Sequence, residues 1–553
     1  MHQTVPEFFR PDGPTAQTKF PMNSENGHRR MAITCIRYLT LCSTNTLSAY
    51  RRPDIQFWTS KHFEAHVDYL YQRPFIAYAL SYLEKHIHRC GEDSRISGLL
   101  SRFCKQLTDS RNPVYYIFGN WVTRNQCLGV AANMQHNSDN AKNIRKVLLH
   151  TATRKKYSRV VEALLVAGAE VEARQDGKTA LIVAAEGGDY ATVQVLLDQG
   201  ASIEATRSFE WTALHFAASN GHTGVVRLLS DWGANKEAED ETRRRGLHLA
   251  AANGHTAVVE LLMDLGVDKE AEDGEKQRAL HVASKNGHTA TVELLMKRGV
   301  CKEAEDGAQQ RALHLAAKGG HTAVVGLLIS LGADKEAEDD AKQRALHFAA
   351  KNGHTAVVEL LIDRGADKEA EDIRKRRGLH LAAENGHTAT VELLIDRGAD
   401  KEAADREKQR GLHYAAGNGH NPVIQLLVGR GANIEARDVF GWQALHTAAW
   451  NGYAGTIQMM VQDLGVKKEA KDWCGWTAVH VASINGQDAA IRMLVENLGA
   501  DKGAKDDSGW TALHFVAVLG LKDTTRLLAK ILNVDKTVQN KKGETAAKLA
   551  QEL

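Results

Sequence analysis

The feature that most constrains this chain is a short motif that returns every 33 or 34 residues. It consists of a small residue, an aliphatic residue and a histidine. The histidines are spaced by 33 residues up to His446 and by 34 after it: His215, His248, His281, His314, His347, His380, His413, His446, His480 and His514. Ile182 and His150 continue the series toward the N-terminus, and Lys548 ends it. Self-similarity at such a period predicts an array of stacked structural repeats.

The segment 344–371 illustrates the plan of one unit. Apolar spacing predicts a short helix that ends at Gly353, and a second helix that Thr355 caps and Gly365 ends. The residues expected to face the core are Leu346, Ala349, Ala350, Val358, Leu361 and Ile362. The chain contains 46 Gly and only 8 Pro, which suits many helices joined by glycine-ended turns. A unit this short cannot bury its apolar faces alone, so neighbouring units must stack.

These residues carry a family resemblance. The segment 212–238, TALHFAASNGHTGVVRLLSDWGANKEA, resembles the ankyrin repeat, whose consensus contains T-P-L-H, G-H and G-A-D. About twelve full units and a C-terminal half unit follow this pattern, and the array is expected to span 141–553. The resemblance implies an all-α fold, an ankyrin-repeat α-solenoid with β-hairpin fingers and a concave face that binds partners.

Six units depart from the family pattern at two positions. Arginine replaces the threonine three residues before the histidine, and each lost cap is expected to cost about 1 kcal/mol. These arginines are Arg245, Arg278, Arg311, Arg344, Arg377 and Arg410. The turn glycine is also replaced, by Arg243, Lys276, Gln309, Lys342, Lys375 and Lys408. Because side chains disfavour φ > 0, looser and more basic fingers are expected there, with part of the deficit offset by nearby acidic residues.

The residues before the array show no period. They are expected to form a disordered tail, 1–30, and a small helical, winged-helix-like head domain, 31–140. The segments 28–41 and 73–87 resemble the helical region that precedes the repeats in fungal NACHT-ankyrin proteins. That resemblance implies an alternative function, in which the chain is the sensor or regulatory portion of a signalling NTPase for self/non-self recognition.

The nucleotide-binding motif of such a switch is not found in this sequence. A P-loop needs the pattern GxxxxGK[ST], and the Gly177-Lys178-Thr179 segment has Glu172 where the first glycine should stand. This segment is therefore interpreted as a turn before a helix, with the NTPase module missing from the chain.

Composition and charge weigh against several other functions. The net charge is +2 and no basic block is interleaved with aromatics, so nucleic acid is not expected as a partner. No run of 18 apolar residues or signal-peptide pattern is present, and the seven cysteines are scattered, so we expect no membrane partner and a location in the cytoplasm or nucleus. No cofactor, metal or small-molecule substrate is expected.

The repeated polar residues of the array are expected to have structural roles, and no catalytic role is expected for them. Of the 25 histidines, 18 lie at two repeated positions, where an imidazole that bonds backbone is the expected role. The repeated Asp and Glu of the KEAED segments are interpreted as solvated loop residues. No site motif rises above background, and the chain is predicted not to be an enzyme.

Aromatic residues near the fingers are the strongest candidates for binding. Four tryptophans stand four residues before their motif position: Trp211, Trp442, Trp476 and Trp510. Phe440, Trp450 and Trp473 lie near them, and in the family this region lines the groove. Exposed aromatic clusters are favoured interface anchors, although packing of each ring on the next finger remains an equal alternative. Arg244, Arg374 and Arg376 form a second, basic candidate surface. The predicted function is thus a non-enzymatic scaffold that binds a protein partner.

Overall fold

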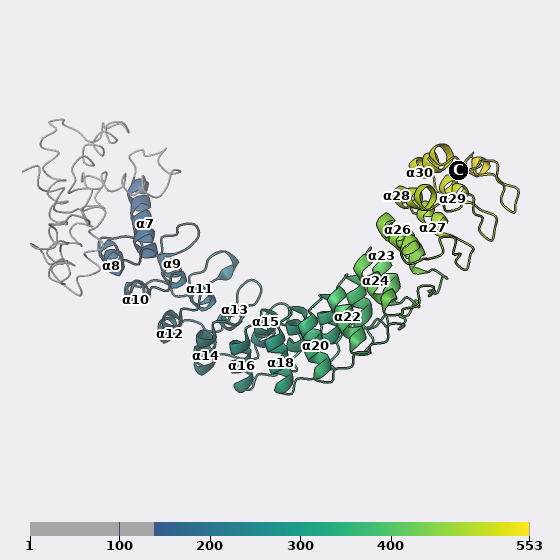
Figure 1. Ribbon diagram of the computed structural model, residues 1–553. Helices are drawn as coiled ribbons and strands as arrows, with labels where there is room; N and C mark the ends of the chain where they lie inside the picture. The colour runs from purple at the N-terminus through teal and green to yellow at the C-terminus, as the bar shows by residue number, and fades with distance from the viewer. Residues whose placement is uncertain (1–98, 100–137, 552–553) are drawn as a thin grey trace, which may run out of the picture. The chain divides into compact units, whose positions relative to one another are not determined.

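The computed structural model describes Leu99 and residues 138–551 (Figure 1). The chain divides into two compact units, Met1–Asp268 (unit 1) and Lys269–Leu553 (unit 2). The predicted tail, 1–30, lies outside the described residues, as does the predicted head, 31–140, apart from Leu99 and the last three positions. The description that follows concerns 138–551.

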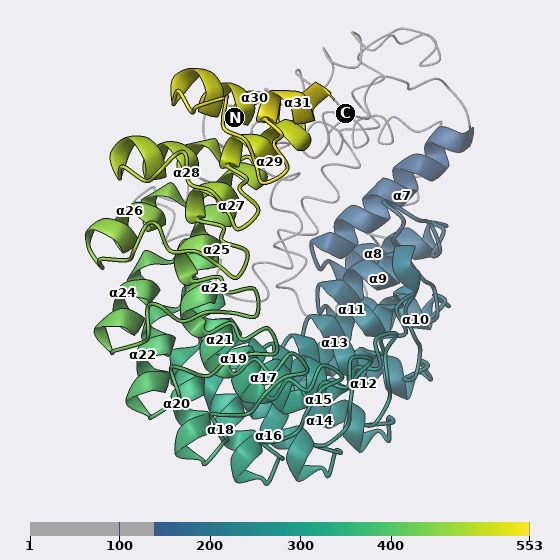
Figure 2. The ribbon, with the colours of Figure 1, turned by 90° about the vertical axis from the view of Figure 1, so that its right-hand side faces the viewer.

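Unit 2 is a series of helix pairs. The first helices of the pairs are α15 (Ala279–Lys285), α17 (Ala312–Lys318), α19 (Ala345–Lys351), α21 (Gly378–Glu384), α23 (Gly411–Gly417), α25 (Ala444–Trp450), α27 (Ala478–Ile484), α29 (Ala512–Val518) and α31 (Ala546–Gln551). The second helices are α16 (Thr289–Lys297), α18 (Thr322–Ser330), α20 (Thr355–Asp363), α22 (Thr388–Asp396), α24 (Asn421–Gly429), α26 (Ala454–Gln462), α28 (Asp488–Arg492) and α30 (Lys522–Arg526). Figure 2 shows the first helices in one row and the second helices in another.

Unit 1 follows the same plan after a longer opening helix. Its elements are α7 (Ser138–Arg154), α8 (Ser158–Val166), α9 (Ala180–Glu186), α10 (Tyr190–Asp198), the 3₁₀ turn η2 (Ser208–Glu210), α11 (Ala213–Ser219), α12 (Thr223–Asp231), α13 (Gly246–Ala252) and α14 (Thr256–Asp264). In each unit a first helix packs on the next first helix, as α9 does on α11 and α19 on α21. The described residues therefore form the helical repeat solenoid that the sequence predicted.

Local sequence sets where the helices end. Helix α19 stops because the Asn352 side chain donates a hydrogen bond to the Phe348 carbonyl oxygen (3.0 Å) and Gly353 follows at φ 71°. Gly365, at φ 77°, ends α20 in the same way. Thr355 is the first residue of α20 and does not cap it; its hydroxyl group bonds that of Thr390 (2.8 Å) instead. The predicted glycine stops are confirmed and the predicted Thr355 cap is wrong.

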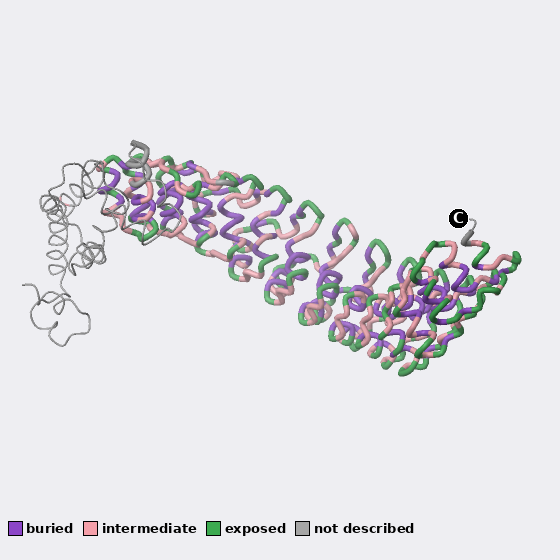
Figure 3. Tube along the Cα trace, turned by 90° about the horizontal axis from the view of Figure 1, so that it is seen from above, coloured by how far each residue is buried: buried purple, intermediate pink, exposed green. Residues whose placement is uncertain are grey.

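The core runs along each unit between the two rows of helices (Figure 3). Ala349 and Ala350 are fully buried, and their small side chains let α19 lie close to its neighbours. Leu346 is 2% exposed, and burying a leucine side chain stabilises the fold by about 1.5–3 kcal/mol. Val357 belongs to the core although the sequence did not single it out, whereas Ile362 is only half-buried.

The fingers between pairs are tight turns. Within 138–551 no residue lies in a β-strand, and only two isolated bridges occur, Gln175 with Lys178 and Gln539 with Thr545. Neighbouring fingers are joined by single backbone hydrogen bonds, such as that from the Trp473 N–H to the Phe440 carbonyl oxygen (3.2 Å). The predicted β-hairpins are not shown in this range: the two arms of a finger are joined only around its turn, as by the Asp372 N–H to the Arg376 carbonyl oxygen (2.9 Å) and the Lys375 N–H to the Asp372 carbonyl oxygen (2.8 Å).

The change of period from 33 to 34 residues has a structural cause. The extra residue is accommodated at the second helix. After α26 the Leu464 N–H bonds the Met459 carbonyl oxygen five residues back (3.2 Å), and α28 and α30 continue as the π-helical turns η3 (Met493–Asn497) and η4 (Leu527–Ile531). The Leu498 N–H accordingly bonds the carbonyl oxygen five residues back (3.0 Å). Since the extra residue widens one turn of the helix, the first helices keep their register.

Candidate interaction surface

The repeated motif histidine is a buried structural group. In α17 the Arg311 backbone N–H donates to Nδ1 of His314 (2.9 Å), and Nε2 of His314 lies 2.8 Å from the Ala337 carbonyl oxygen. A backbone N–H can only donate and a carbonyl can only accept, so the ring is neutral with its proton on Nε2. Burial lowers the pKa of His314, which favours the same neutral form. The imidazole therefore starts its own helix and holds the following loop.

The second repeated histidine joins neighbouring repeats. Nε2 of His354, which precedes α20, lies 3.0 Å from the Lys318 carbonyl oxygen at the end of α17. The equivalent contacts are made by His222, His255, His321, His387 and His420. The predicted role of these histidines, bonding to backbone, is confirmed, and the partner is a carbonyl 36 residues away.

The Asp of the KEAED segments organises each finger. Oδ1 of Asp372 accepts the backbone N–H groups of Arg374 and Arg376 (both 2.8 Å), and only 3% of Asp372 is exposed. Hydrogen bonds also stabilise the ionised carboxylate of Asp240. Burial alone would raise the pKa of Asp240, but bonds from Thr242 and Arg244 outweigh it and lower that pKa to about 2. The interpretation of these aspartates as solvated residues was wrong.

The replaced turn glycines do not prevent the left-handed turn. Lys342 has a φ of 58° and Lys375 a φ of 60°. Both angles are positive, as are the larger φ angles of the turn glycines in the other fingers. The strain of about 1 kcal/mol at such a residue is opposed by the two hydrogen bonds that backbone N–H groups of the finger donate to its Asp. The φ > 0 conformation, which was expected to be costly for these side chains, is therefore kept.

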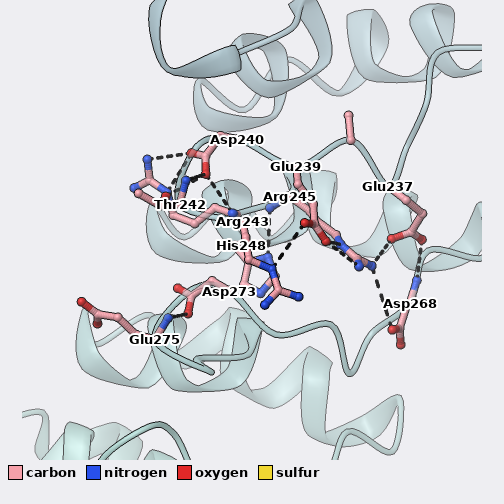
Figure 4. Close-up of polar contacts among 12 residues, drawn as sticks. Glu237, Glu239, Asp240, Thr242, Arg243, Arg245, His248, Asp268, Asp273 and Glu275 are labelled. Carbon is pink, nitrogen blue, oxygen red and sulfur yellow. Dashed lines mark hydrogen bonds and ion pairs between the residues drawn. The ribbon is translucent and has the colours of Figure 1, made fainter.

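The arginines that replace threonine are held by glutamates of the same repeat. Arg245 forms ion pairs with Glu237 and, at 2.9 Å, with Glu239, and its guanidinium lies 4.0 Å from Asp268 (Figure 4). The same pairs recur at Arg278, Arg311, Arg344 and Arg377, while Arg410 keeps only the pair with Glu402. The first glutamate also accepts a backbone N–H of the next repeat, as Glu303 does from Asp334 (3.1 Å). We call this arrangement the Glu–Arg clamp.

The first helix begins with the same hydrogen bond in the arginine repeats as in the repeats that keep the threonine before a motif histidine. Where a motif histidine follows the threonine, the hydroxyl groups of Thr477 and Thr511 contact His Nδ1 (3.0 and 2.8 Å). Where Ile182 or Lys548 replaces the histidine, Thr179 and Thr545 accept the backbone N–H three residues on (3.4 and 3.3 Å). In both kinds of repeat, the residue before the helix donates its backbone N–H to Nδ1 of the motif histidine, and Arg311 makes this hydrogen bond as Thr477 does. The expectation that each arginine removes a cap was wrong.

Three of the four tryptophans that stand four residues before the motif position cross-link neighbouring fingers within their units, and the fourth, Trp510, only packs on other rings. The indole N–H of Trp442 donates to Asp472 of the next finger (3.1 Å), that of Trp476 to Asp506 (3.3 Å), and that of Trp211 to Asp240 (3.0 Å). The rings also pack: those of Trp476 and Trp510 lie 5.2 and 5.0 Å from that of Phe515. All four tryptophans are half-buried, which favours the packing alternative for these positions.

Two other aromatic side chains remain open to solvent. Phe440 and Trp473, on adjacent finger tips of unit 2, are each 62% exposed, and Val439 beside them is 40% exposed. The Arg437 guanidinium lies 5.0 Å from the Trp473 ring centroid and bonds the Gly441 carbonyl oxygen (2.8 Å). We call Val439, Phe440 and Trp473 the aromatic tip. Trp450 is half-buried against Trp442, with ring centroids 5.5 Å apart.

The basic candidates are not equivalent. Arg244 pairs with Asp240 (2.9 Å) and lies over the Trp211 ring, and Arg376 pairs with Asp372 (3.0 Å) and Glu384 (3.2 Å). Arg374 is exposed at its finger tip. Two of the three basic candidates, Arg244 and Arg376, are therefore bound to carboxylates of their own units.

The Gly177-Lys178-Thr179 segment is a turn before a helix, as predicted. Gly177 takes φ 76°, Lys178 pairs with Glu186, and the Thr179 hydroxyl accepts the Ile182 N–H (3.4 Å) at the start of α9. Among residues 138–551, no group of His, Cys, Asp or Glu could hold a metal ion. In the same range, every helix is too short or too polar to cross a membrane.

Comparison with known proteins identifies the repeat. A family model described as ankyrin repeats (3 copies) matches 149–240, 247–339, 301–372, 379–472, 412–506 and 462–540, together more than half of the chain. A search of curated proteins finds no match. The NACHT-ankyrin resemblance of 28–41 and 73–87 falls outside both the matched and the described residues.

Proposed function

Since this chain belongs to the ankyrin repeat family, whose repeats are generally protein–protein interaction modules, we propose that it binds a protein partner through the finger tips of unit 2. The aromatic tip is the anchor of this surface. The observation that carries the proposal is the 62% exposure of both Phe440 and Trp473 on adjacent fingers. Large aromatic side chains left open to water are typical of interface anchors.

The Trp473 ring is held in place before any partner arrives. It packs over Gly441, where an added Cβ would lie only 2.7 Å from the ring, and over the Arg437 guanidinium. The backbone N–H of Trp473 bonds Phe440, so the two tips are fixed to each other. A preorganised aromatic side chain loses little conformational entropy on binding, which favours affinity.

The remaining aromatic candidates pack within the fingers and are assigned a supporting role. Trp442 lies between Asp472 and Trp450, and Trp476 and Trp510 pack on Phe515. Their role in the proposal is to fix the spacing of the fingers, and contact with the partner is assigned to the aromatic tip. Arg374, on an exposed finger tip two repeats before Phe440, would contribute at the polar rim.

Affinity capture with the full chain tests the proposal. Wild type and the Phe440→Ala/Trp473→Ala variant would be compared for the proteins they retain from the cells that make the chain. The variant should lose at least one partner that wild type retains, with unchanged helicity by circular dichroism. Leu331→Ala, which removes a 42% exposed apolar side chain elsewhere in unit 2, should retain it. An identical set of partners for wild type and the double variant would refute the role of the aromatic tip.

The sensor function of a NACHT-type switch is a narrower version of the same proposal. It rests on the resemblance of 28–41 and 73–87, and in it the partner surface would regulate an NTPase module. Reading the genomic sequence upstream for a P-loop separates a sensor portion from an independent scaffold.

A further inference from the structure

A cavity of about 370 Å³ lies within unit 1, between the end of α7, helix α9 and the two fingers on either side of that helix. Its size is in the range of small ligand pockets. The charged side chains that line it are Arg154, Lys156, Asp176, Lys178, Glu186, Asp189 and Arg207. Basic groups outnumber acidic ones by four to three, so the cavity has a net positive lining.

The three carboxylates are already occupied. Asp176 pairs with Arg154 (3.2 Å), Glu186 pairs with Lys178, and Asp189 accepts a hydrogen bond from the Thr192 hydroxyl group. The Thr192 hydroxyl group is neutral, so Asp189 still offsets one positive charge of the lining, and the other two basic side chains are left outside any ion pair.

Lys156 and Arg207 are those two side chains. Neither makes a hydrogen bond or an ion pair within the part of the chain that the structure describes, and Nε of Arg207 is buried without a partner. A buried donor that has lost water and gained no acceptor destabilises the fold. An anion in the cavity would remove that penalty.

The repeat register shows which group is missing. Trp211 and Asp240 stand four and eight residues before their motif histidines, and the Trp211 indole N–H donates to Asp240 (3.0 Å). One repeat earlier, Lys178 and Arg207 hold the equivalent positions. Lys178 and Arg207 are thus both donors, whereas the equivalent pair in the next repeat consists of a donor, Trp211, and a carboxylate, Asp240.

We propose that this cavity binds an oxyanion, the carboxylate or phosphate of a partner's side chain, in the place of the absent finger carboxylate. Arg207 would supply the buried Nε–H group and Lys156 a second positive charge. The geometry differs from that of a P-loop, because the bound group lies against side chains and no glycine-rich loop wraps it. The site is separate in sequence from the aromatic tip, and it stands or falls independently of that surface.

Isothermal titration calorimetry on the full chain tests this site. Inorganic phosphate and glutarate would be titrated separately at pH 7.5 and constant ionic strength, so that the two sources of an oxyanion are distinguished. Saturable binding of either anion is expected, and the one that binds identifies the preferred source. Arg207→Asp should weaken that binding at least tenfold. This substitution introduces the residue that most other fingers carry, so the fold should persist.

A matched variant controls for general electrostatics. Arg227→Asp makes the same change of charge on the exposed side of α12, outside the cavity, and should bind within twofold of wild type. If Arg207→Asp fails to fold, Arg207→Gln removes the charge at similar length and should show the same loss. The proposal is overturned if neither anion saturates, if the Arg207 variants bind like wild type, or if Arg227→Asp loses as much affinity.

Discussion

Unit 2 contains two kinds of repeat that reach the same backbone by different side chains. In the arginine repeats, 270–410, the Glu–Arg clamp ties the helix start to the loop before it. In the tryptophan repeats, 435–514, the indole N–H ties one finger to the Asp of the next. Both keep the buried motif histidine and the finger Asp. The comparison shows that these two groups define the repeat, while the tie between them can be ionic or aromatic.

Acid provides the largest expected effect, because it acts on the group that both kinds of repeat share. Burial lowers the pKa of His281, His314, His347, His380, His413, His446, His480 and His514 in unit 2. The unfolded chain then binds more protons than the folded one below the ordinary value of about 6.5. Stability is fully present above that pH and is lost as pH falls from it toward the folded values.

Urea unfolding at pH 7.5 and pH 5.0 measures this loss, and hydrogen exchange assigns it to regions. Both kinds of repeat should be destabilised together, since eight imidazoles titrate with the same sign. The window between these two pH values is the one in which an ordinary imidazole titrates. A free energy of unfolding that is flat across it would contradict the neutral, buried imidazole.

Trp476→Ala tests the aromatic tie. The substitution removes ring packing on Phe515 (5.2 Å) and the bond to Asp506 (3.3 Å), so the free energy of unfolding should fall by about 2 kcal/mol. Trp473→Ala, three residues earlier on the same finger but 62% exposed, should change the free energy of unfolding by less than about 0.5 kcal/mol. Equal losses in the two variants, measured by urea unfolding, would erase the distinction between structural and exposed tryptophans.

Arg311→Thr tests the ionic tie and separates the sequence-based expectation from the structural one. Restoring the family residue was expected to add about 1 kcal/mol. Because Thr cannot reach Glu303 and Glu305, the structure predicts a loss of up to about 1 kcal/mol, smaller at 1 M NaCl. Arg364→Thr, at an exposed helix end, is the control for changing Arg to Thr. A gain in stability at low salt would mean that the clamp contributes nothing.

The turn residue gives the smallest expected effect. Lys342→Gly should stabilise the fold by about 0.5 kcal/mol, because glycine relieves the strain at φ 58° but loses more entropy on folding. In the tryptophan repeats the reverse exchange is costly, since a Cβ at Gly475 would lie 2.6–2.7 Å from Asp507 atoms of the next finger. Thermal unfolding of Lys342→Gly and Gly475→Ala should therefore show opposite shifts, and shifts of the same sign would refute the contrast.

The sequence by itself determined the period, the helix pair and the positions of the buried apolar residues. These follow from local rules, because glycine stops and apolar spacing act within one unit of the chain. It also gave the right role to both sets of repeated histidines. The place of the 34th residue was not predicted, because a π-helical turn leaves no mark in the apolar pattern of α28 or α30.

Only the tertiary structure decided what the charged and aromatic residues do. Asp372 and Glu303 looked like solvated loop residues, yet each accepts backbone N–H groups, and the regular recurrence of Asp eight residues before the histidine was the available signal. Trp442 and Trp473 are the same residue type on adjacent fingers, and one is packed while the other is exposed. The physical reason is that Glu303 and Trp442 find their partners, Asp334 and Asp472, in the next repeat, across a distance that local sequence does not encode. The Asp372 bonds reach only two and four residues and depend on the finger closing into its turn.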